Sequence, residues 1–223
     1  MHMSRFVRYM VVLGLLLLVC APGWAQHDGL QAKKILDQTA ETFRRSGGVS
    51  AGFMLNHYSN KVIDGKSAGS IQLQGDKFVL TAGGITTWFD GRTQWSYVAA
   101  NGEVNVTTPT PQELQQLNPY AFLQLYRQGY DFRLGTASSF ARKQVWDVLL
   151  VANAQKEEFS RIRLYIAKDG YQPLFIRLER EGEPAGSWTE IVITDYRVHQ
   201  HYGEAFFTFD SKRYPDAEII DLR

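Results

Sequence analysis

Apolar and polar side chains alternate along most of the chain beyond residue 48, and this pattern predicts many short β-strands. A period of two places successive side chains on opposite faces of a sheet. The strands predicted in this way cover residues 49–58, 66–74, 77–81, 85–89, 93–98, 103–108, 131–134, 143–151, 161–166, 174–179, 188–198 and 206–209. We expect about ten or eleven of these segments to form one sheet, and a sheet of that size normally curls, splits into two layers or closes into a barrel.

Two-residue turn signals separate many of these strands. They are Asp64-Gly65, Asp90-Gly91, Asn101-Gly102 and Asp169-Gly170. The pair Asp90-Gly91 joins two strands that are rich in aromatic residues, which is typical of a β-hairpin. Consecutive strands joined by tight turns predict an antiparallel meander.

A helical period precedes the strands and predicts a helix over residues 29–45. Its apolar face carries Ala32, Ile35, Leu36, Thr39, Ala40 and Phe43, opposite Lys33, Lys34, Asp37, Gln38 and Glu41. Asp28 can cap the start of this helix, and Gly47-Gly48 ends it.

A second helical region is predicted after residue 109. Thr110 and Glu113 have the spacing of a capping box, with a proline at the first helical position between them. Asn118-Pro119 gives another helix start, and residues 119–127 are apolar on most sides. Such a segment must contact protein or ligand on more than one side. We therefore interpret residues 119–126 as a lid.

Residues 1–25 have the features of a secretory signal. Arg5 and Arg8 precede an apolar stretch too short to span a bilayer, and Gly23 and Ala25 are suitable for cleavage before Gln26. An uncleaved membrane anchor and a lipoprotein signal acylated at Cys20 are the alternatives. Residues 26–223 contain no repeat or linker, which predicts a single domain.

The composition of the mature chain argues against several kinds of chemistry. The signal contains Cys20, the only cysteine, and two of the 24 basic residues, so residues 26–223 have a slightly negative net charge. Basic residues do not outnumber acidic ones, so the charge does not favour binding to nucleic acid. His199 and His201 could chelate a metal, but no third ligand has a recognisable spacing, and we expect a solvated strand end. No Gly-x-Ser-x-Gly motif is present. We expect no cofactor, no metal and no enzyme activity.

Aromatic residues are the strongest remaining signal. Four tryptophans lie within the predicted strands, together with several phenylalanines and tyrosines. An ordinary sheet core explains any one of them. The whole set, together with the apolar segment 119–126, indicates a cavity that holds an apolar ligand without reacting with it.

Several short motifs resemble a known family. The block Phe89-Asp90-Gly91-Arg92-Thr93-Gln94-Trp95-Ser96-Tyr97 resembles its Asp-Gly-Lys-Thr-Leu-Trp-x-Tyr hairpin. Residues 49–53 and 69–73 resemble the entries to its first strands, 118–122 its lid helix and 206–209 its closing segment. The motifs follow one another in the family's order over most of residues 26–223. The chain therefore resembles the periplasmic outer-membrane lipoprotein carriers, the LolA-like proteins.

The resemblance implies an α+β, mostly β fold: a strongly curved, unclosed antiparallel β-barrel whose concave face is covered by helices. It also implies a monomeric periplasmic carrier or chaperone. Such a carrier receives the acyl chains of lipoproteins from an inner-membrane ABC transporter and delivers them to an outer-membrane acceptor. One feature departs from the pattern. Better-known members carry an arginine between the second and third strands that holds the lid shut, whereas residues 74–78 here contain Lys77 as the only cation.

We expect the cavity to be lined by inward-pointing residues of the strands and by the lid. The predicted lining residues are Phe53, Leu55, Ile71, Leu73, Phe78, Leu80, Trp88, Trp95, Tyr97, Tyr120, Phe122, Leu123, Ile162, Leu164, Ile176, Trp188 and Ile191. A slip of one residue along a strand would exchange the two faces.

Three other functions are compatible with the sequence. The same curved sheet could sense a lipid or glycan, or bind another envelope protein, without shuttling. A lipid hydrolase could use dispersed carboxylates and His57. A periplasmic scaffold with a filled core needs no ligand at all.

Overall fold

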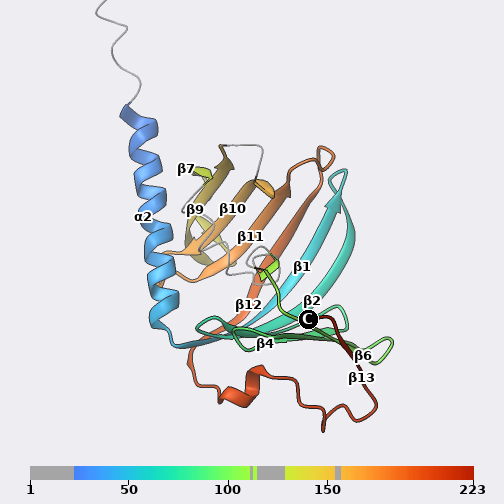
Figure 1. Cartoon of the computed structure of the whole chain (residues 1–223). Coiled ribbons are helices and arrows are strands. Elements are labelled where there is room, and N and C mark those ends of the chain that lie inside the picture. The colour runs from blue at the N-terminus through green and yellow to red at the C-terminus, as the bar shows by residue number, and fades with distance from the viewer. Residues whose placement is uncertain (1–22, 111–112, 115–128, 154–156) are drawn as a thin grey trace, which may run out of the picture.

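One large sheet follows the N-terminal helix in the computed structural model, which describes residues 23–110, 113–114, 129–153 and 157–223 (Figure 1). The helix is α2 (Gly23–Arg45). The strands are β1 (Gly48–Ser59), β2 (Val62–Gln74), β3 (Lys77–Ala82), β4 (Ile85–Phe89), β5 (Gln94–Val98), β6 (Glu103–Thr107), β7 (Tyr130–Leu134), β8 (Ser139–Phe140), β9 (Lys143–Ala152), β10 (Phe159–Ala167), β11 (Pro173–Arg180), β12 (Trp188–Gln200) and β13 (Glu218–Asp221). A short 3-10 helix, η1 (Glu204–Phe207), precedes β13.

The strand order is β13-β6-β5-β4-β3-β2-β1-β12-β11-β10-β9-β7, and β8 pairs with β9. All neighbours are antiparallel except β13 and β6, which are parallel. Two meanders therefore meet at the β1–β12 pair. The outermost strands, β13 and β7, do not pair with each other, so the described sheet is an unclosed barrel. The predicted fold class is confirmed, although the sheet has 13 strands and one long helix is described.

Bulges at the junction of the two meanders help to curve the sheet. The β1–β12 register shifts between Gly48 and Ser50 and again between Ser50 and Gly52. A β-carbon on Gly48 would lie 2.2 Å from the backbone oxygen of Gln200, so the close approach of β12 requires glycine there. On the opposite strand Asp195 has a φ of 48°. An extra residue in one strand bends that strand and increases its twist.

The helix packs as its apolar face predicts. Ala32, Ile35, Leu36 and Thr39 are buried, while the lysines and acids of the opposite face are exposed or partly exposed. The helix contacts β7 and β9. It begins at Gly23 rather than Gly29, so Asp28 lies inside it and does not cap it. No proline occurs between residues 23 and 28 to stop the helix from extending.

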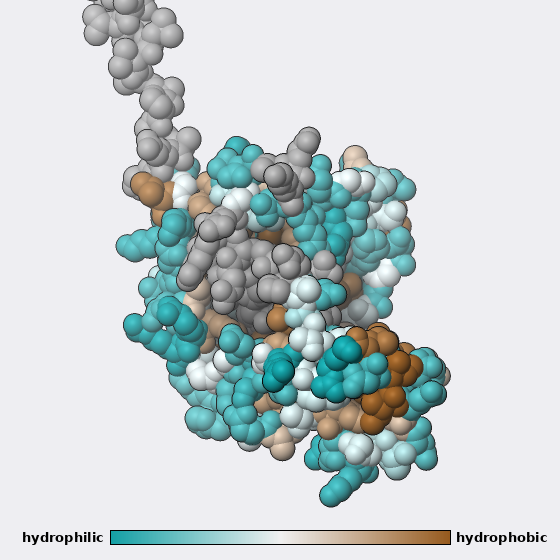
Figure 2. All heavy atoms as spheres, viewed as in Figure 1, coloured by the Kyte–Doolittle hydropathy of each residue, from teal (hydrophilic) through white to brown (hydrophobic). Residues whose placement is uncertain are grey.

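The two faces of the sheet are covered by different parts of the chain. We call the face that shares a core with α2 the inner face and the opposite one the outer face. Residues 202–217 lie on the outer face, below β4 and β6 and away from α2 (Figure 1), and lead into β13 at the edge of the sheet. Figure 2 shows apolar side chains gathered around β13, where Ile219 and Leu222 are exposed.

An ion pair between a buried carboxylate and a partly exposed arginine lies on the outer face of β9 and β10. The side chain of Asp147 is fully buried, and the guanidinium of Arg163 donates to both of its oxygens at 2.9 and 2.6 Å. The backbone N–H of Ala137 donates to Asp147 as well. This hydrogen-bonded partner raises the pKa of Arg163. The extra donor and the bidentate geometry offset the desolvation of the carboxylate.

Two turn predictions need correction. The chain does not turn at Asp64-Gly65, which lie inside β2; it turns at Asn60 and Lys61, whose φ angles are 50° and 66°. Gly65 instead lies opposite His57, next to a register shift in the β1–β2 pair, a position where glycine is common. The hairpin at Asp90-Gly91 is confirmed, but its loop also includes Arg92 and Thr93.

The predicted strand at residues 206–209 is wrong. Phe206 and Phe207 belong to η1. The Tyr202 ring stacks on Phe206, with 4.6 Å between ring centroids, and Phe207 is buried. The short strands β8 and β13 were too brief to predict.

The capping box is confirmed: the backbone N–H of Thr110 donates to Glu113 at 2.7 Å, and that of Glu113 donates to Oγ1 of Thr110.

The inner-face core predicts a large effect of truncating a fully buried residue. Leu164→Ala removes a side chain with no exposed surface, and we expect the free energy of unfolding to fall by about 2–5 kcal/mol. Met54→Ala is the control because Met54 is 51% exposed on the outer face of β1; it should change the free energy by about 0.5 kcal/mol or less. Urea denaturation followed by circular dichroism measures both. Equal effects would contradict the assignment of the faces.

Candidate functional site

The inner face of the sheet is an apolar wall built from neighbouring strands. Residues that pair directly across strands project from the same face. One row of such pairs crosses six strands in the order Leu55, Ile191, Ile176, Leu164, Val148 and Leu134. A second row contains Val49, Leu73, Phe78 and Phe89. We call this surface the inner wall.

Most predicted lining residues of the strands lie on the inner wall. They are Phe53, Leu55, Ile71, Leu73, Phe78, Leu80, Ile162, Leu164, Ile176 and Ile191, and all belong to one apolar core together with residues of α2. Gly69 makes room for Phe53, because a β-carbon there would lie 2.4 Å from the end of the Phe53 ring. The predicted lid residues Tyr120, Phe122 and Leu123 lie outside the described residues.

Four predicted residues lie on the outer face, so the expectation that they share one lining with the others is wrong. These residues are Trp88, Trp95, Tyr97 and Trp188. Trp88 pairs with Val79 and Trp95, whereas its neighbours Thr87 and Phe89 pair with Leu80 and Phe78 of the inner wall. The predicted inward positions of these strands were therefore shifted by one residue along the chain.

The C-terminal segment explains why aromatic residues occupy the outer face there. The Trp88 ring contacts those of Phe209 and Tyr214 at centroid distances of 5.6 and 5.8 Å, and Tyr97 contacts Tyr214 at 4.6 Å. Because both faces of β4 and β5 are covered, aromatic content marks burial without identifying the side.

Trp188 is held on the outer face by a different set of contacts. Its ring stacks on Tyr58 with 4.6 Å between centroids and lies 3.9 Å from the guanidinium carbon of Arg177. Its indole N–H donates to Glu190 at 2.9 Å. A ring with polar partners on several sides is part of an outer-face network, not of the inner wall.

The inner wall also contains residues that the sequence analysis did not select. Phe89, Val148 and Leu150 are fully or almost fully buried. Phe89 follows Trp88 directly, so an error of one residue in the inward assignment of β4 selected Trp88 in its place. Val148 and Leu150 belong to the apolar strand predicted at 143–151, whose inward residues could not be chosen without the pairing register.

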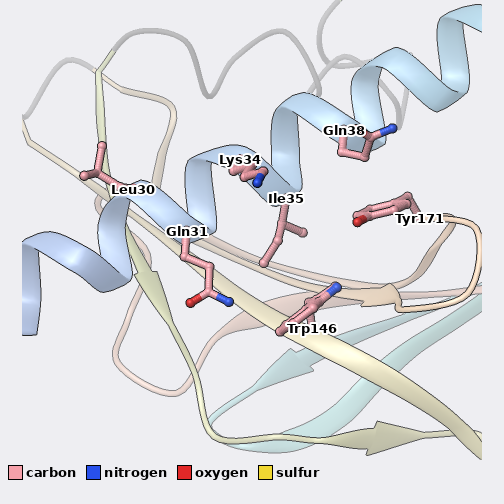
Figure 3. Close-up of a pocket in the computed structure, with 7 residues that line it drawn as sticks. All are labelled: Leu30, Gln31, Lys34, Ile35, Gln38, Trp146 and Tyr171. Atoms are coloured by element: carbon pink, nitrogen blue, oxygen red, sulfur yellow. The ribbon is translucent and has the colours of Figure 1, made fainter.

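A groove opens between the helix and the inner wall (Figure 3). It has a volume of about 510 Å³ and is lined by Leu30, Gln31, Lys34, Ile35 and Gln38 of α2, Trp146 of β9, and Tyr171 of the β10–β11 turn. Ile35 points from the helix toward Trp146. Nζ of Lys168 lies 4.3 Å from the centroid of the Trp146 ring. The groove therefore combines an apolar floor with cationic side chains nearby.

The stretch between the second and third strands is tied to the C-terminal segment. Lys77 forms an ion pair with Glu204 of η1. The side-chain oxygen of Gln74 accepts from the backbone N–H of Tyr202 at 3.0 Å, and its amide donates to the Tyr202 carbonyl at 3.3 Å. Here Lys77 secures η1 against β3 on the outer face.

Neither a membrane-spanning helix nor a metal-ligand cluster occurs in the described part of the chain. None of its helices is both long and apolar enough to cross a membrane. The same residues contain no group of three or more histidine, cysteine or acidic side chains that could hold a metal ion.

Comparison with known proteins identifies relatives of this chain. The family model described as "Outer membrane lipoprotein carrier protein LolA" matches residues 23–183. No curated protein matches the chain.

Several solved structures resemble the chain. An uncharacterized conserved protein from Thermus thermophilus has a TM-score of 0.57 at 16% identity, over 86% of this chain and 99% of that one. A LolA superfamily protein from Nitrosomonas europaea has a TM-score of 0.41 at 11% identity, over 80% and 97% of the two chains. MucB in the MucA/MucB complex of Pseudomonas aeruginosa has a TM-score of 0.45 at 17% identity, over 82% and 62%. The first of these shares the fold.

Tyr130 of the inner wall predicts a pH effect on stability. Burial, followed by the charge of Glu157, raises its pKa from 10.0 to about 12, and its hydroxyl donates to the Phe159 carbonyl at 3.1 Å. The folded state therefore holds this proton more tightly than the unfolded state. Its stabilising contribution is complete below pH 10.0 and is lost as the pH rises to about 12.

Comparison with Tyr130→Phe isolates this contribution, because burial also raises the pKa of Tyr196 to about 12. The variant cannot ionise at this position, so its free energy of unfolding should fall less steeply than that of the wild type between pH 10 and 12. Urea denaturation at a series of pH values measures the two slopes. Parallel slopes would show that ionisation of Tyr130 is not linked to folding.

Proposed function

The chain belongs to the outer membrane lipoprotein carrier (LolA) family, and on that premise we propose that it carries acylated lipoproteins by holding their acyl chains against the inner wall. In this proposal the protein makes and breaks no covalent bond. It acts by shielding apolar surface from water.

The continuous inner wall is the observation that supports this proposal. Its longest row places apolar side chains side by side on six strands. Each methylene of an acyl chain that leaves water contributes roughly 0.8 kcal/mol. A lipoprotein with long acyl chains therefore needs such a surface to cross an aqueous compartment.

Burial of the inner wall in this structure would keep the affinity moderate. Leu73 and Phe78 are each 1% exposed, so an entering acyl chain must replace side chains that already cover them. The ligand and the protein's own cover then compete for one surface, and the net affinity is the difference between the two interactions. A carrier needs this property because it must also release its cargo.

The remaining parts of the proposal concern location and partners. Residues 1–25 would direct export to the periplasm, and residues 26–223 would act as a single monomeric domain. An inner-membrane ABC transporter would supply the lipoprotein, and an outer-membrane acceptor would take it. The groove between α2 and Trp146 reaches the surface next to the inner wall, where part of the cargo could extend into solvent.

Binding of a triacylated lipopeptide tests the proposal directly. The protein, purified gently from the periplasm and examined by native mass spectrometry, should contain bound acylated species. It should also bind a synthetic triacylated lipopeptide in solution. If no acylated species is bound and the lipopeptide does not bind, the carrier function is wrong. If a lipid without a peptide is recovered instead, the sensing function is favoured.

A pair of adjacent residues on β1 shows whether the inner wall is the binding surface. Leu55 belongs to the inner wall, and Met54 projects from the outer face. Leu55→Gln places an amide against the acyl chain, which costs about 1–3 kcal/mol, so we expect roughly tenfold weaker binding of the lipopeptide. Met54→Gln should leave the affinity within about twofold. Fluorescence titration measures both, and equal losses would exclude the inner wall.

A further inference from the structure

The inner wall changes from apolar to polar at one border. The row that begins with Ala51, Ile71 and Leu80 continues with Thr87, Ser96 and Asn105. The row of Val49, Leu73, Phe78 and Phe89 continues with Gln94 and Thr107. Strands β4 to β6 therefore present hydroxyl and amide groups on the same face that is apolar elsewhere.

Three of these polar side chains form a hydrogen-bonded chain. The side-chain amide of Gln94 donates to Oγ of Ser96 at 3.2 Å. Oγ of Ser96 lies 3.2 Å from Oγ1 of Thr87, and Thr87 is only 4% exposed. When Ser96 accepts from Gln94, its own proton is available to Thr87. These contacts fix the three groups relative to one another.

The side-chain carbonyl of Gln94 is buried, and its Oε1 accepts no hydrogen bond within the described part of the chain. Buried polar atoms are normally paired, and an unpaired one lowers stability. With Ser96 donating to Thr87, the described residues leave one acceptor, Gln94 Oε1, and one donor, the Thr87 hydroxyl, beside an apolar row.

We propose that Thr87, Gln94 and Ser96 form a polar subsite for the amide that links an acyl chain to a peptide, an inference that rests on the proposed carrier function. A secondary amide offers one N–H to Gln94 Oε1 and one carbonyl to the Thr87 hydroxyl. A free carboxylate fits less well, because none of the three side chains carries a charge that could compensate for its lost hydration.

The dimensions of the neighbouring row suit the apolar part of such a ligand. From Gln94, paired residues lead across Phe89, Phe78 and Leu73 to Val49. Four strand spacings of about 4.8 Å give a length of roughly 19 Å. An extended long-chain acyl group has a similar length. The subsite therefore lies at the end of a track on which the acyl chain can lie.

Two lipopeptides that differ by one N–H group test the subsite. In one, palmitate is joined to the peptide through an amide; in the other, an ester oxygen replaces that N–H. The wild-type protein should bind the amide about tenfold more tightly than the ester, since the ester leaves Gln94 Oε1 unpaired. Gln94→Met should abolish this preference, so that the two affinities agree within twofold.

Two further variants show whether the loss of the amide preference is specific to Gln94. Gln72→Met introduces the same change on the outer face of β2, and it should retain the tenfold preference. Ser96→Ala releases the Gln94 amide and should reduce the preference without introducing a larger side chain; it also serves if Gln94→Met fails to fold. A wild-type protein without the preference, or a Gln94→Met protein that keeps it, would overturn the subsite. Failure of both lipopeptides to bind would instead overturn the carrier function, and the subsite with it.

Discussion

Pairing between β1 and β12 is the interaction on which the rest of the structure depends. It joins two meanders that are otherwise built from local hairpins. The ring of His57 lies 3.3 Å from the hydroxyl of Thr189, 132 positions further along the chain. Without this pair, the row from Leu55 to Leu134 would not cross from one meander to the other. The same pair carries the bulges next to Gly48 and Gly52, which bend the sheet around its apolar face.

The sequence predicted the elements well because each depends on local chemistry. The face of α2 followed from the spacing of Ala32, Ile35 and Leu36, and the capping box from Thr110 and Glu113. Most strands followed from alternation. The turn between β1 and β2 was misplaced because Asn60-Lys61 adopts the left-handed conformation without a glycine, whereas Gly65 marks a register shift inside a strand.

The inward and outward assignments could be predicted only in part. Where one face is polar, as in β10 with Arg161 and Arg163, the apolar positions identify the inner wall. In β4 and β5 both faces are covered by other parts of the chain, and the inward positions include Thr87 and Ser96 while the outward ones are Trp88 and Trp95. Hydrophobicity therefore indicates the wrong face there. Only the pairing register and the position of residues 202–223, both set by distant parts of the chain, determine the correct one.

The C-terminal residues that pack over Trp88 and Tyr97 tie one half of the barrel to the end of the chain. Strands β3 to β6 are held from outside by η1, Phe209 and Tyr214. These residues lie beyond the 23–183 segment that matches the family. Strands β9 to β11 are covered on that surface by a nearby part of the chain, in which Phe140 of β8 packs against Tyr165 and Phe175. The polar border on β4 to β6 therefore lies on strands that are fixed by a distant segment, whereas the cover of β9 to β11 is local in sequence.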